Sequence, residues 1–234
     1  MDFFRFPHTP HLTWLGQGKP RDDKVLPPDE AKEILEQDVA VEEKVDGANV
    51  GFSVDENGDL QVQNRGSLLT RERCHPQFAP LWRWLQPKQA SLAETLFPDL
   101  MLFGEWCYAV HSIRYTKLPD WFLAFDVFDR SSGTFWSVPR RDKLARRLGL
   151  AVVPRIGVGR FDLRSLQALL ATSQLTDGPA EGLYVRRDER DQLVARSKLV
   201  NREFTQAIDE HWSRRSLVAN QVVEEFSPAK DGTS

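Results

Sequence analysis

The sequence predicts an α+β domain in which antiparallel sheets are flanked by helices. Most of the expected strands are joined by short turns, which is how antiparallel strands connect. Several segments between them have helical periodicity and are expected to pack outside the sheets. No internal repeat or low-complexity linker divides the 234 residues. We therefore expect a single domain with an N-terminal arm and short helix (1–38), a core (39–200) and a short helical tail (201–234).

Composition limits the classes of protein to which the chain can belong. Its 41% hydrophobic and 28% charged residues are typical of a soluble globular protein. Cys74 and Cys107 make neither a disulfide framework nor a zinc site, so we expect a reducing cytoplasm. No apolar run approaches a membrane span and no signal peptide begins the sequence, so we expect neither secretion nor membrane insertion. The net charge of −3 leaves any nucleic-acid binding to a local basic face.

The amino-terminal residues 1–26 are expected to be irregular. Their histidines, His8 and His11, are expected to be ordinary loop residues because no third metal ligand lies nearby in the sequence. Pro28 then begins a short helix that has Ile34 on its apolar face.

A lysine lies between the next two expected strands. Residues 39–41 are apolar and largely β-branched, and residues 50–54 alternate as a half-buried strand does. Between them Asp46 and Gly47 form a strong hairpin signal, because Gly accepts a positive φ and Asp tolerates one. The pattern predicts a hairpin that holds Lys44 on a rigid edge.

The amine of this lysine could react only if it lost its proton. A free lysine has a pKa of about 10.4, so burial, neighbouring cations or a bound metal would have to lower that value. The simpler interpretation of this stretch alone is a strand lysine, Lys44, that forms an ion pair with Glu42 or Glu43.

The remaining elements follow from periodicity, turn residues and capping residues. The expected strands are 60–63, 100–106, 121–129, 152–153, 181–186 and 193–198. The expected helices are 78–97 with a break at Pro87, 139–148, 163–170 with Asp162 as its cap, and 203–226. The expected turns and loops are Asn57-Gly58, 64–67, 108–120 and 188–191, and the last eight residues are expected to fray.

Taken one at a time, other charged and aromatic residues have simple structural roles. These roles are a surface turn for Arg65, a local cap or pair for Glu105, a core position for Phe125 and a cross-strand ion pair for Glu181 and Lys198. Asp126 is harder to dismiss, because an acid inside an apolar strand is costly unless it is paired or functional. The basic cluster at 140–147 forms either a solvated helix face or a contact for an RNA backbone.

Six short motifs in order resemble the nucleotidyltransferase superfamily of polynucleotide ligases and mRNA capping enzymes. The chain is most similar to ATP-dependent RNA ligases of the nick-sealing branch. The motifs are Lys44-Val45-Asp46-Gly47, Asn64-Arg65-Gly66, Phe103-Gly104-Glu105, Phe125-Asp126, Glu181-Gly182 and Arg196-Ser197-Lys198. Each motif alone is weak, but six in order are specific. The resemblance implies an ATP-grasp-like adenylation domain.

The resemblance also implies roles for these residues. Lys44 would become covalently adenylylated. The other implied nucleotide contacts are the ribose for Arg65 and Glu105, adenine for Phe125, and the α-phosphate for Arg196 and Lys198. Arg65 would also contact the 5′-phosphate of the substrate. Three further residues are expected to contact the nucleotide: Glu43, Asn49 and Arg186.

A divalent metal, Mg²⁺ or Mn²⁺, completes the implied site. Glu181 is expected to hold it, with Asp126 as a second ligand. The cations Arg196 and Lys198 are expected to lower the pKa of Lys44 by like-charge repulsion, so that the amine attacks the α-phosphorus of ATP.

The implied activity is ATP-dependent joining of RNA 3′-hydroxyl and 5′-phosphate ends through lysyl-AMP and an RNA-adenylate. The expected setting is RNA repair, with a nicked or bridged RNA and possible help from a protein partner. The stretch after Lys198 is too short for the oligonucleotide-binding barrel of DNA ligases and capping enzymes, which favours RNA as the acceptor. The alternatives are a DNA nick ligase, an enzyme that adenylylates ends without joining them, and a non-catalytic nucleotide- or RNA-binding module.

Overall fold

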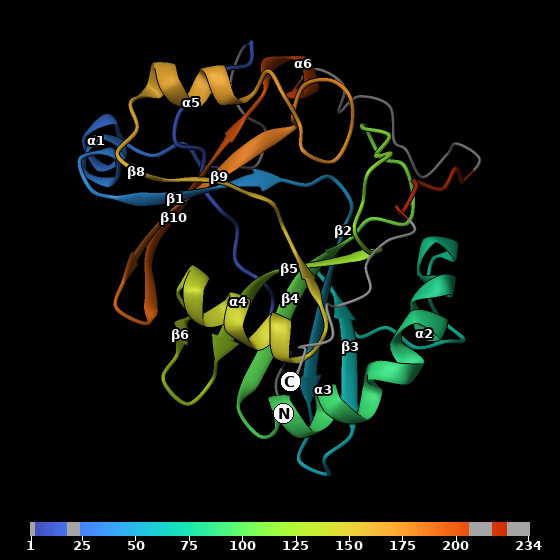
Figure 1. Ribbon diagram of the computed structural model, residues 1–234. Coiled ribbons are helices and arrows are strands. Elements are labelled where there is room, and N and C mark those ends of the chain that lie inside the picture. Colours follow the sequence, from blue (N-terminus) through green and yellow to red (C-terminus); the bar gives the residue numbers. More distant parts are fainter. Residues whose placement is uncertain (1–2, 18–23, 206–216, 224–234) are drawn as a thin grey trace, which may run out of the picture.

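The chain crosses from one antiparallel sheet to another directly after the strand that ends in Lys44. The computed structural model describes residues 3–17, 24–205 and 217–223 (Figure 1). The first sheet consists of β1 (Val39–Lys44), β8 (Arg155–Gly159), β9 (Gly182–Glu189) and β10 (Gln192–Val200). Its order is β10-β9-β1-β8, and every pair in it is antiparallel.

The second sheet has six strands. They are β2 (Ala48–Val54), β3 (Leu60–Asn64), β4 (Leu100–Trp106), β5 (Phe122–Asp129), β6 (Thr134–Phe135) and β7 (Ala151–Val152). Five of them follow the order β3-β2-β4-β5-β6 in antiparallel pairs, and β7 adds in parallel beside β5.

Helices cover one face of each sheet (Figure 1). They are α1 (Pro28–Leu35), α2 (Ala79–Leu85), α3 (Gln89–Leu96), α4 (Val138–Arg147), α5 (Leu163–Leu169) and the short α6 (Arg202–Thr205). Two 3₁₀ turns, Pro76–Phe78 and Gln86–Lys88, flank α2. None of the helices in the described part of the chain is long and apolar enough to cross a membrane.

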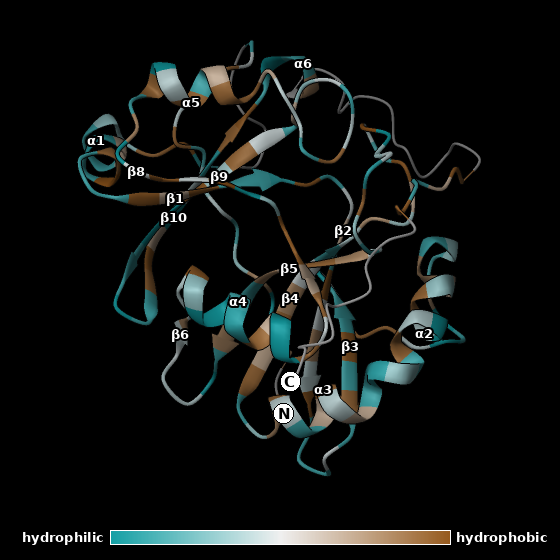
Figure 2. Ribbon diagram, in the orientation of Figure 1, coloured by the Kyte–Doolittle hydropathy of each residue, from teal (hydrophilic) through white to brown (hydrophobic). Residues whose placement is uncertain are grey.

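Two separate apolar cores hold the helices in place. Against the four-stranded sheet, Ile34 of α1 and Leu166 of α5 pack with Val41 and Val185. Against the six-stranded sheet, the apolar faces of α2, α3 and α4 pack with strand residues such as Phe52. In Figure 2 the helices carry both hydrophilic and hydrophobic residues, as expected of helices that bury one face.

Alternation along β1 separates an apolar face from a charged one. Val41 faces the core beneath α1 and α5, whereas Glu42 forms ion pairs with Arg141 of α4 and Arg186 of β9. Because side chains two residues apart share a face, Lys44 lies on the same side as Glu42. This charged side, which faces α4 and β5, carries the candidate site.

Most predicted elements are confirmed, with ends shifted by a few residues. The prediction of a hairpin at Asp46-Gly47 is wrong, because β1 and β2 belong to different sheets. Gly47 does not have a positive φ. It is needed for a close approach instead, since a Cβ at this position would lie 2.6 Å from the Trp106 carbonyl oxygen.

The predicted C-terminal helix is also largely absent from the described residues. Helix α6 is four residues long, and residues 217–223 are extended and pair with the loop that follows β4. Residues 206–216, 224–226 and the last eight residues, which were expected to fray, lie outside the described part. Helical spacing of apolar residues could not reveal that this loop offers backbone partners to the segment. The short strands β6 and β8 were also missed.

Candidate active site

Lys44 and Glu181 form an ion pair at the ends of two adjacent strands. Lys44, the last residue of β1, lies opposite Gly182, the first residue of β9. Its amine donates a hydrogen bond to each carboxylate oxygen of Glu181, at 2.6 Å. A Cβ at Gly182 would lie 2.7 Å from the Leu199 carbonyl oxygen and 3.4 Å from Lys44 Cδ. Strand pairing and a glycine therefore bring two motifs 137 residues apart into contact.

This ion pair keeps the Lys44 amine protonated. Burial has the largest single effect on the pKa of Lys44 and lowers it. The charges of Glu181, Tyr184 and Asp46 and the hydrogen bonds to Glu181 together outweigh burial. The pKa of Lys44 therefore lies above its ordinary value. The expectation that cations would lower it is wrong for the ligand-free protein, because the dominant charges around the amine are acidic.

Two buried carboxyl groups lie beside the amine. Burial raises the pKa of Glu105 to about 8 and the pKa of Glu181 to about 7, although Lys44 opposes both shifts. Glu105 lies on β4 and accepts a hydrogen bond from the Gly47 backbone amide at 3.1 Å. Both carboxyl groups therefore exchange protons near neutral pH at a site that contains a potential nucleophile.

Asp46 is held by the loop that follows β4. Its carboxylate accepts a hydrogen bond from the Ser112 amide at 2.7 Å and another from the Ser112 hydroxyl. Its own amide donates to the hydroxyl of Tyr115, which is fully buried, at 2.8 Å. The ring of His111 lies 3.9 Å from the same carboxylate. Sequence reasoning predicted the loop but no role for Ser112 or Tyr115, since no local motif marks them.

Glu43 points away from this group. It is completely buried and accepts hydrogen bonds from the Ser173 hydroxyl at 2.5 Å and the Gln174 amide at 2.8 Å. Strand alternation places it on the face opposite Lys44. The observed role of Glu43 is to anchor the loop at Ser173, and its nucleotide contact stays a prediction.

Asp126 links two arginines inside the protein. Only 1% exposed, it lies 2.8 Å from Arg186 Nη2 and 2.5 Å from Arg196 Nη1. Arg186 also lies 3.6 Å from Glu42. We predicted Asp126 as a metal ligand and Arg186 as a phosphate contact. Both remain predictions, and in the structure the two side chains form an ion pair with each other. An acid buried in this sheet needs cationic partners, and these arginines supply them.

Arg196 is held by more than this ion pair. Its guanidinium lies 4.5 Å from the ring centres of both Phe6 and Phe135. Phe6 belongs to the N-terminal arm, for which the sequence suggested no firm role. The structure thus ties the predicted phosphate ligand to aromatic rings and to Asp126.

Lys198 lies on the same face of the four-stranded sheet as Lys44. It is opposite Tyr184, and Glu42 lies on that face too. Its charge lowers the pKa of Glu181 and so opposes the effect of burial there. Of the two basic residues in the last motif, Lys198 is therefore the one beside the acidic site.

Phe125 lies at a β-bulge. The register passes from Phe103 opposite Asp126 to Gly104 opposite Ala124, so Phe125 has no partner across the strands. Such a bulge redirects a side chain and often lies near a functional site. The Phe125 ring is half-buried and meets Phe6 edge-on at 5.2 Å.

Asn49 and Arg65 border the site from the six-stranded sheet. Asn49 lies opposite Glu105, and its buried side-chain oxygen has no hydrogen-bond partner among the described residues. Arg65 is exposed in a turn that the Asn64 side chain fixes through two backbone amides at 2.8 Å. No ion pair of the described residues involves Arg65, so both groups remain available to a ligand.

A divalent cation would find carboxylates here but not a complete protein cage. The described residues contain no group of three or more His, Cys, Asp or Glu side chains that could hold a metal ion. Mg²⁺ and similar ions are often held by one or two carboxylates together with substrate phosphates. Glu105 and Glu181 fit that arrangement, since both supply hard oxygen ligands beside Lys44.

One family model matches the chain. It is described as RNA ligase and covers residues 37–200, which include every candidate residue. No curated protein matches at the sequence level.

Solved structures of an RNA ligase from Naegleria gruberi share the fold. The structure with PPi has a TM-score of 0.60 and 19% identity, and the match covers 87% of this chain and 64% of that one. A lysine-to-alanine mutant with ATP and Mn gives 0.59 and 18%, covering 80% and 55%. A lysine-to-methionine mutant with AMP and Mn gives 0.58 and 16%, covering 90% and 65%. The chain thus spans between about half and two thirds of these proteins.

Proposed function

The chain belongs to the RNA ligase family, and on that premise we propose that it joins the 3′-hydroxyl and 5′-phosphate ends of RNA with ATP. The nucleophile would be Lys44, and the metal Mg²⁺ or Mn²⁺. The Naegleria gruberi ligase structures that contain ATP or AMP with Mn support this choice of ligands. Joining such ends is the chemistry of RNA repair, with a nicked or bridged RNA as substrate.

A single observation carries the proposal. The Lys44 amine is largely buried, fixed by two hydrogen bonds to Glu181, and surrounded by acids of its own motif and of two others. A lysine that served only as a structural partner would need one carboxylate. This site instead has Glu105 and Glu181 with pKa values near neutrality, together with Asp46. Perturbed acids around a potential nucleophile are typical of catalytic sites.

In the first step Lys44 Nζ forms a bond to the α-phosphorus of ATP, and the bond from that phosphorus to pyrophosphate breaks. The ammonium must first lose its proton, which passes to solvent once Glu181 no longer holds it. A divalent cation held by Glu181, Glu105 and the phosphates would neutralise phosphate charge and weaken the hold of Glu181 on Lys44. Lys198 contacts the α-phosphate from β10.

Two further transfers complete the reaction. The phosphate of an RNA 5′ end attacks the lysyl-AMP phosphorus, and the phosphorus–nitrogen bond to Lys44 breaks. An RNA 3′-hydroxyl then attacks the activated 5′-phosphate, and AMP leaves. The exposed Arg65 is the proposed contact for the RNA 5′-phosphate, and the unpartnered oxygen of Asn49 is available to a ribose hydroxyl. All three steps use one site, so positioning is the main contribution of the protein.

The decisive experiment is the intact mass of the full chain after incubation with ATP and Mg²⁺ or Mn²⁺. We expect a gain of one AMP that Lys44→Ala abolishes. Nicked RNA and nicked DNA duplexes then identify the acceptor, and accumulation of 5′-adenylylated strands without sealing would indicate an end-adenylylating enzyme. ATP binding with no AMP transfer, in protein shown not to be adenylylated beforehand, would contradict the proposal.

A further inference from the structure

The loop after β4 is fastened by a segment from the far end of the chain. Residues 217–223 lie beside residues 107–118, and Figure 1 shows the two in contact at the edge of the molecule. Backbone hydrogen bonds join them on both sides of the segment. The donors and acceptors are Val110 to Val218, Asn220 to Tyr108, Gln221 to Tyr115, Leu118 to Gln221 and Val223 to Leu118, at 2.8 to 3.2 Å.

Asn220 is the centre of this contact. Its side chain is 4% exposed and accepts a hydrogen bond from the Tyr115 amide at 2.8 Å. The amide group of the same side chain donates to the carbonyl oxygens of Cys107 and Ala109, at 2.8 and 3.2 Å. One side chain therefore ties the beginning of the loop to its middle.

The same loop holds the turn that carries the nucleophile. The Tyr115 hydroxyl accepts the hydrogen bond of the Asp46 amide, and Ser112 donates twice to the Asp46 carboxylate. Asp46 lies two residues after Lys44, and Gly47 donates to Glu105. Hydrogen bonds therefore link Asn220 to Tyr115 and Tyr115 to Asp46, two residues after Lys44.

We infer that Asn220 is a positioning residue for the adenylylation of Lys44, and that residues 217–223 clamp the active-site loop. The inference rests on the proposed function. The clamp lies outside residues 37–200, the part that matches the family model. Its effect is indirect, because Asn220 touches the loop and the loop touches Asp46.

The chemistry of Asn220 suggests two informative substitutions. Asn220→Ala removes every side-chain contact. Asn220→Asp keeps the shape and the acceptor for the Tyr115 amide, but its ionised carboxylate would face the carbonyl oxygens of Cys107 and Ala109. Only the protonated acid can donate to a carbonyl, so this variant should hold the loop at low pH and release it at high pH. Gln221→Ala is the matched control, because the Gln221 side chain is exposed and its contacts with the loop use the backbone.

The test is the single-turnover rate of AMP transfer to Lys44 in the full chain, measured from pH 6 to 8.5. With Asn220→Ala we expect a loss of about tenfold to a hundredfold at saturating ATP, with the KM for ATP within about twofold, because misplacement rather than binding is affected. The rate of Asn220→Asp should approach the native rate at pH 6. As the pH rises, its rate relative to the native chain should fall to that of Asn220→Ala or below. Sealing of a pre-adenylylated nicked RNA, which bypasses the lysine, should be much less affected.

Thermal unfolding separates this role from a general loss of structure. A folded Asn220→Ala variant with the native adenylylation rate would overturn the inference, as would an Asn220→Asp variant with the native pH profile. Failure of the native chain to form lysyl-AMP would instead overturn the proposed function. Hydrogen exchange would then test whether residues 217–223 still hold the loop. Asn220→Ala should speed exchange of the Asp46 amide, and Gln221→Ala should not.

Discussion

The Arg141 guanidinium donates hydrogen bonds to both oxygens of the Glu42 carboxylate, at 3.2 and 2.6 Å, and neither side chain is more than 1% exposed. Arg141 belongs to α4, and Glu42 lies on β1 two residues before Lys44. The same guanidinium donates to the Phe125 carbonyl oxygen at 2.7 Å. This ion pair therefore fixes a helix, a strand and the bulge at Phe125 around the candidate nucleophile.

Removing one partner of the Glu42–Arg141 ion pair should strongly reduce the stability of the protein. Arg141→Met leaves the Glu42 carboxylate buried without its main partner, and we expect the free energy of unfolding to fall by about 3–5 kcal/mol. Combining Glu42→Leu with Arg141→Met removes both charges and should recover more than half of that loss. Denaturant unfolding measures both. Equal losses in the single and double variants would show that packing, and not an unpaired charge, sets the cost.

Glu105 should make stability depend on pH in a direction that can be worked out. Its folded pKa is about 8, raised by burial from 4.5, so between these values the folded state holds more protons than the unfolded state. Stability from this group is complete below pH 4.5 and is lost as the pH rises through 8. From pH 5 to pH 9, the free energy of unfolding of Glu105→Gln should therefore rise relative to that of the native chain by about 1–3 kcal/mol. Urea unfolding across that range tests this, and exposed Glu94→Gln controls for the substitution. A pH-independent difference would contradict the prediction.

The parts of the site that could be predicted are those marked by local sequence. Lys44, Glu105 and Glu181 lie at strand ends, and strand patterns and turn residues place such ends well. Gly47 shows where this reasoning stops. Asp-Gly is a strong local signal for a hairpin, but the glycine is required by the backbone of Trp106. That residue is 59 positions away in the sequence, on the strand that pairs with β2, and no local pattern reports such an approach.

The ion-pair partners of Asp126 could not be predicted for a related reason. An acid within an apolar strand indicates that a partner exists, as Asp126 did, but does not identify the partner. Arg186 and Arg196 became its partners only through the pairing of β9 with β10 and the approach of that sheet to β5. The two arginines were therefore predicted to contact a ligand, whereas the structure shows that they neutralise the buried charge of Asp126.

Gly47→Ala should disturb the site directly. The added Cβ would lie 2.6 Å from the Trp106 carbonyl oxygen and 3.1 Å from Glu105 Cγ, so the turn must move. We expect at least a tenfold loss in the rate of lysyl-AMP formation and a loss of about 1–3 kcal/mol in stability. Gly58→Ala is a useful comparison, because Gly58 has a φ of +87° and open space around it. Gly58→Ala should lower stability but leave the rate of lysyl-AMP formation unchanged. A similar loss of rate in both variants would contradict a specific role for Gly47 in the site.

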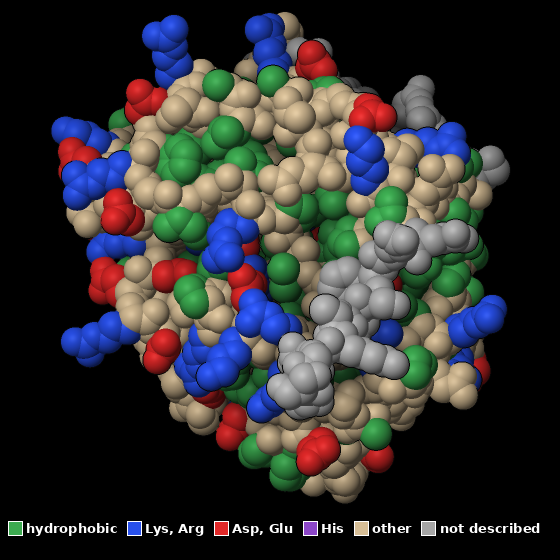
Figure 3. All heavy atoms as spheres, viewed as in Figure 1, with side chains coloured by type: hydrophobic (Ala, Val, Ile, Leu, Met, Phe, Trp, Pro, Cys, Tyr) green, Lys and Arg blue, Asp and Glu red, His purple; other side chains and the backbone are tan. Residues whose placement is uncertain are grey.

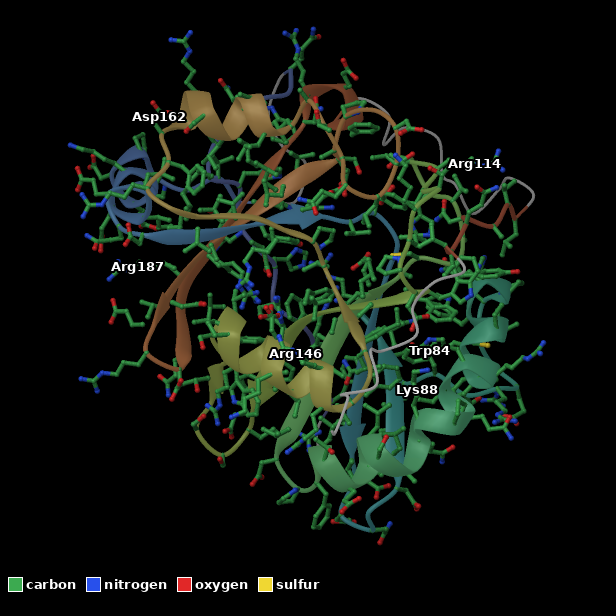
Figure 4. All side chains as sticks on the ribbon, in the orientation of Figure 1. Trp84, Lys88, Arg114, Arg146, Asp162 and Arg187 are labelled. Atoms are coloured by element: carbon green, nitrogen blue, oxygen red, sulfur yellow. The ribbon has the colours of Figure 1, made fainter. Side chains whose placement is uncertain are left out.

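The exposed face of α4 carries basic residues that we predict to contact an RNA backbone. Figure 3 shows Lys and Arg side chains gathered over this helix, and Arg146 is labelled on it in Figure 4. Lys143, Arg146 and Arg147 are exposed, and none of them has an ion pair within the described ranges. The one acid of the helix, Asp142, is engaged by Arg141. On a chain of net charge −3, cations without acidic partners favour a polyanion over a merely solvated surface.

Removing two of these charges should weaken RNA binding and leave the first chemical step intact. With Arg146→Gln and Arg147→Gln together, we expect affinity for a nicked RNA duplex to fall by about tenfold at low salt. The slope of log affinity against log salt should decrease by about 2, because two phosphate contacts release fewer counterions. AMP transfer to Lys44 should stay within about twofold of native, since α4 meets the site only through its buried face. Arg160→Gln with Arg164→Gln removes the same charge near α5 and should change neither quantity. If both pairs weaken binding equally, net charge rather than a surface on α4 attracts the RNA.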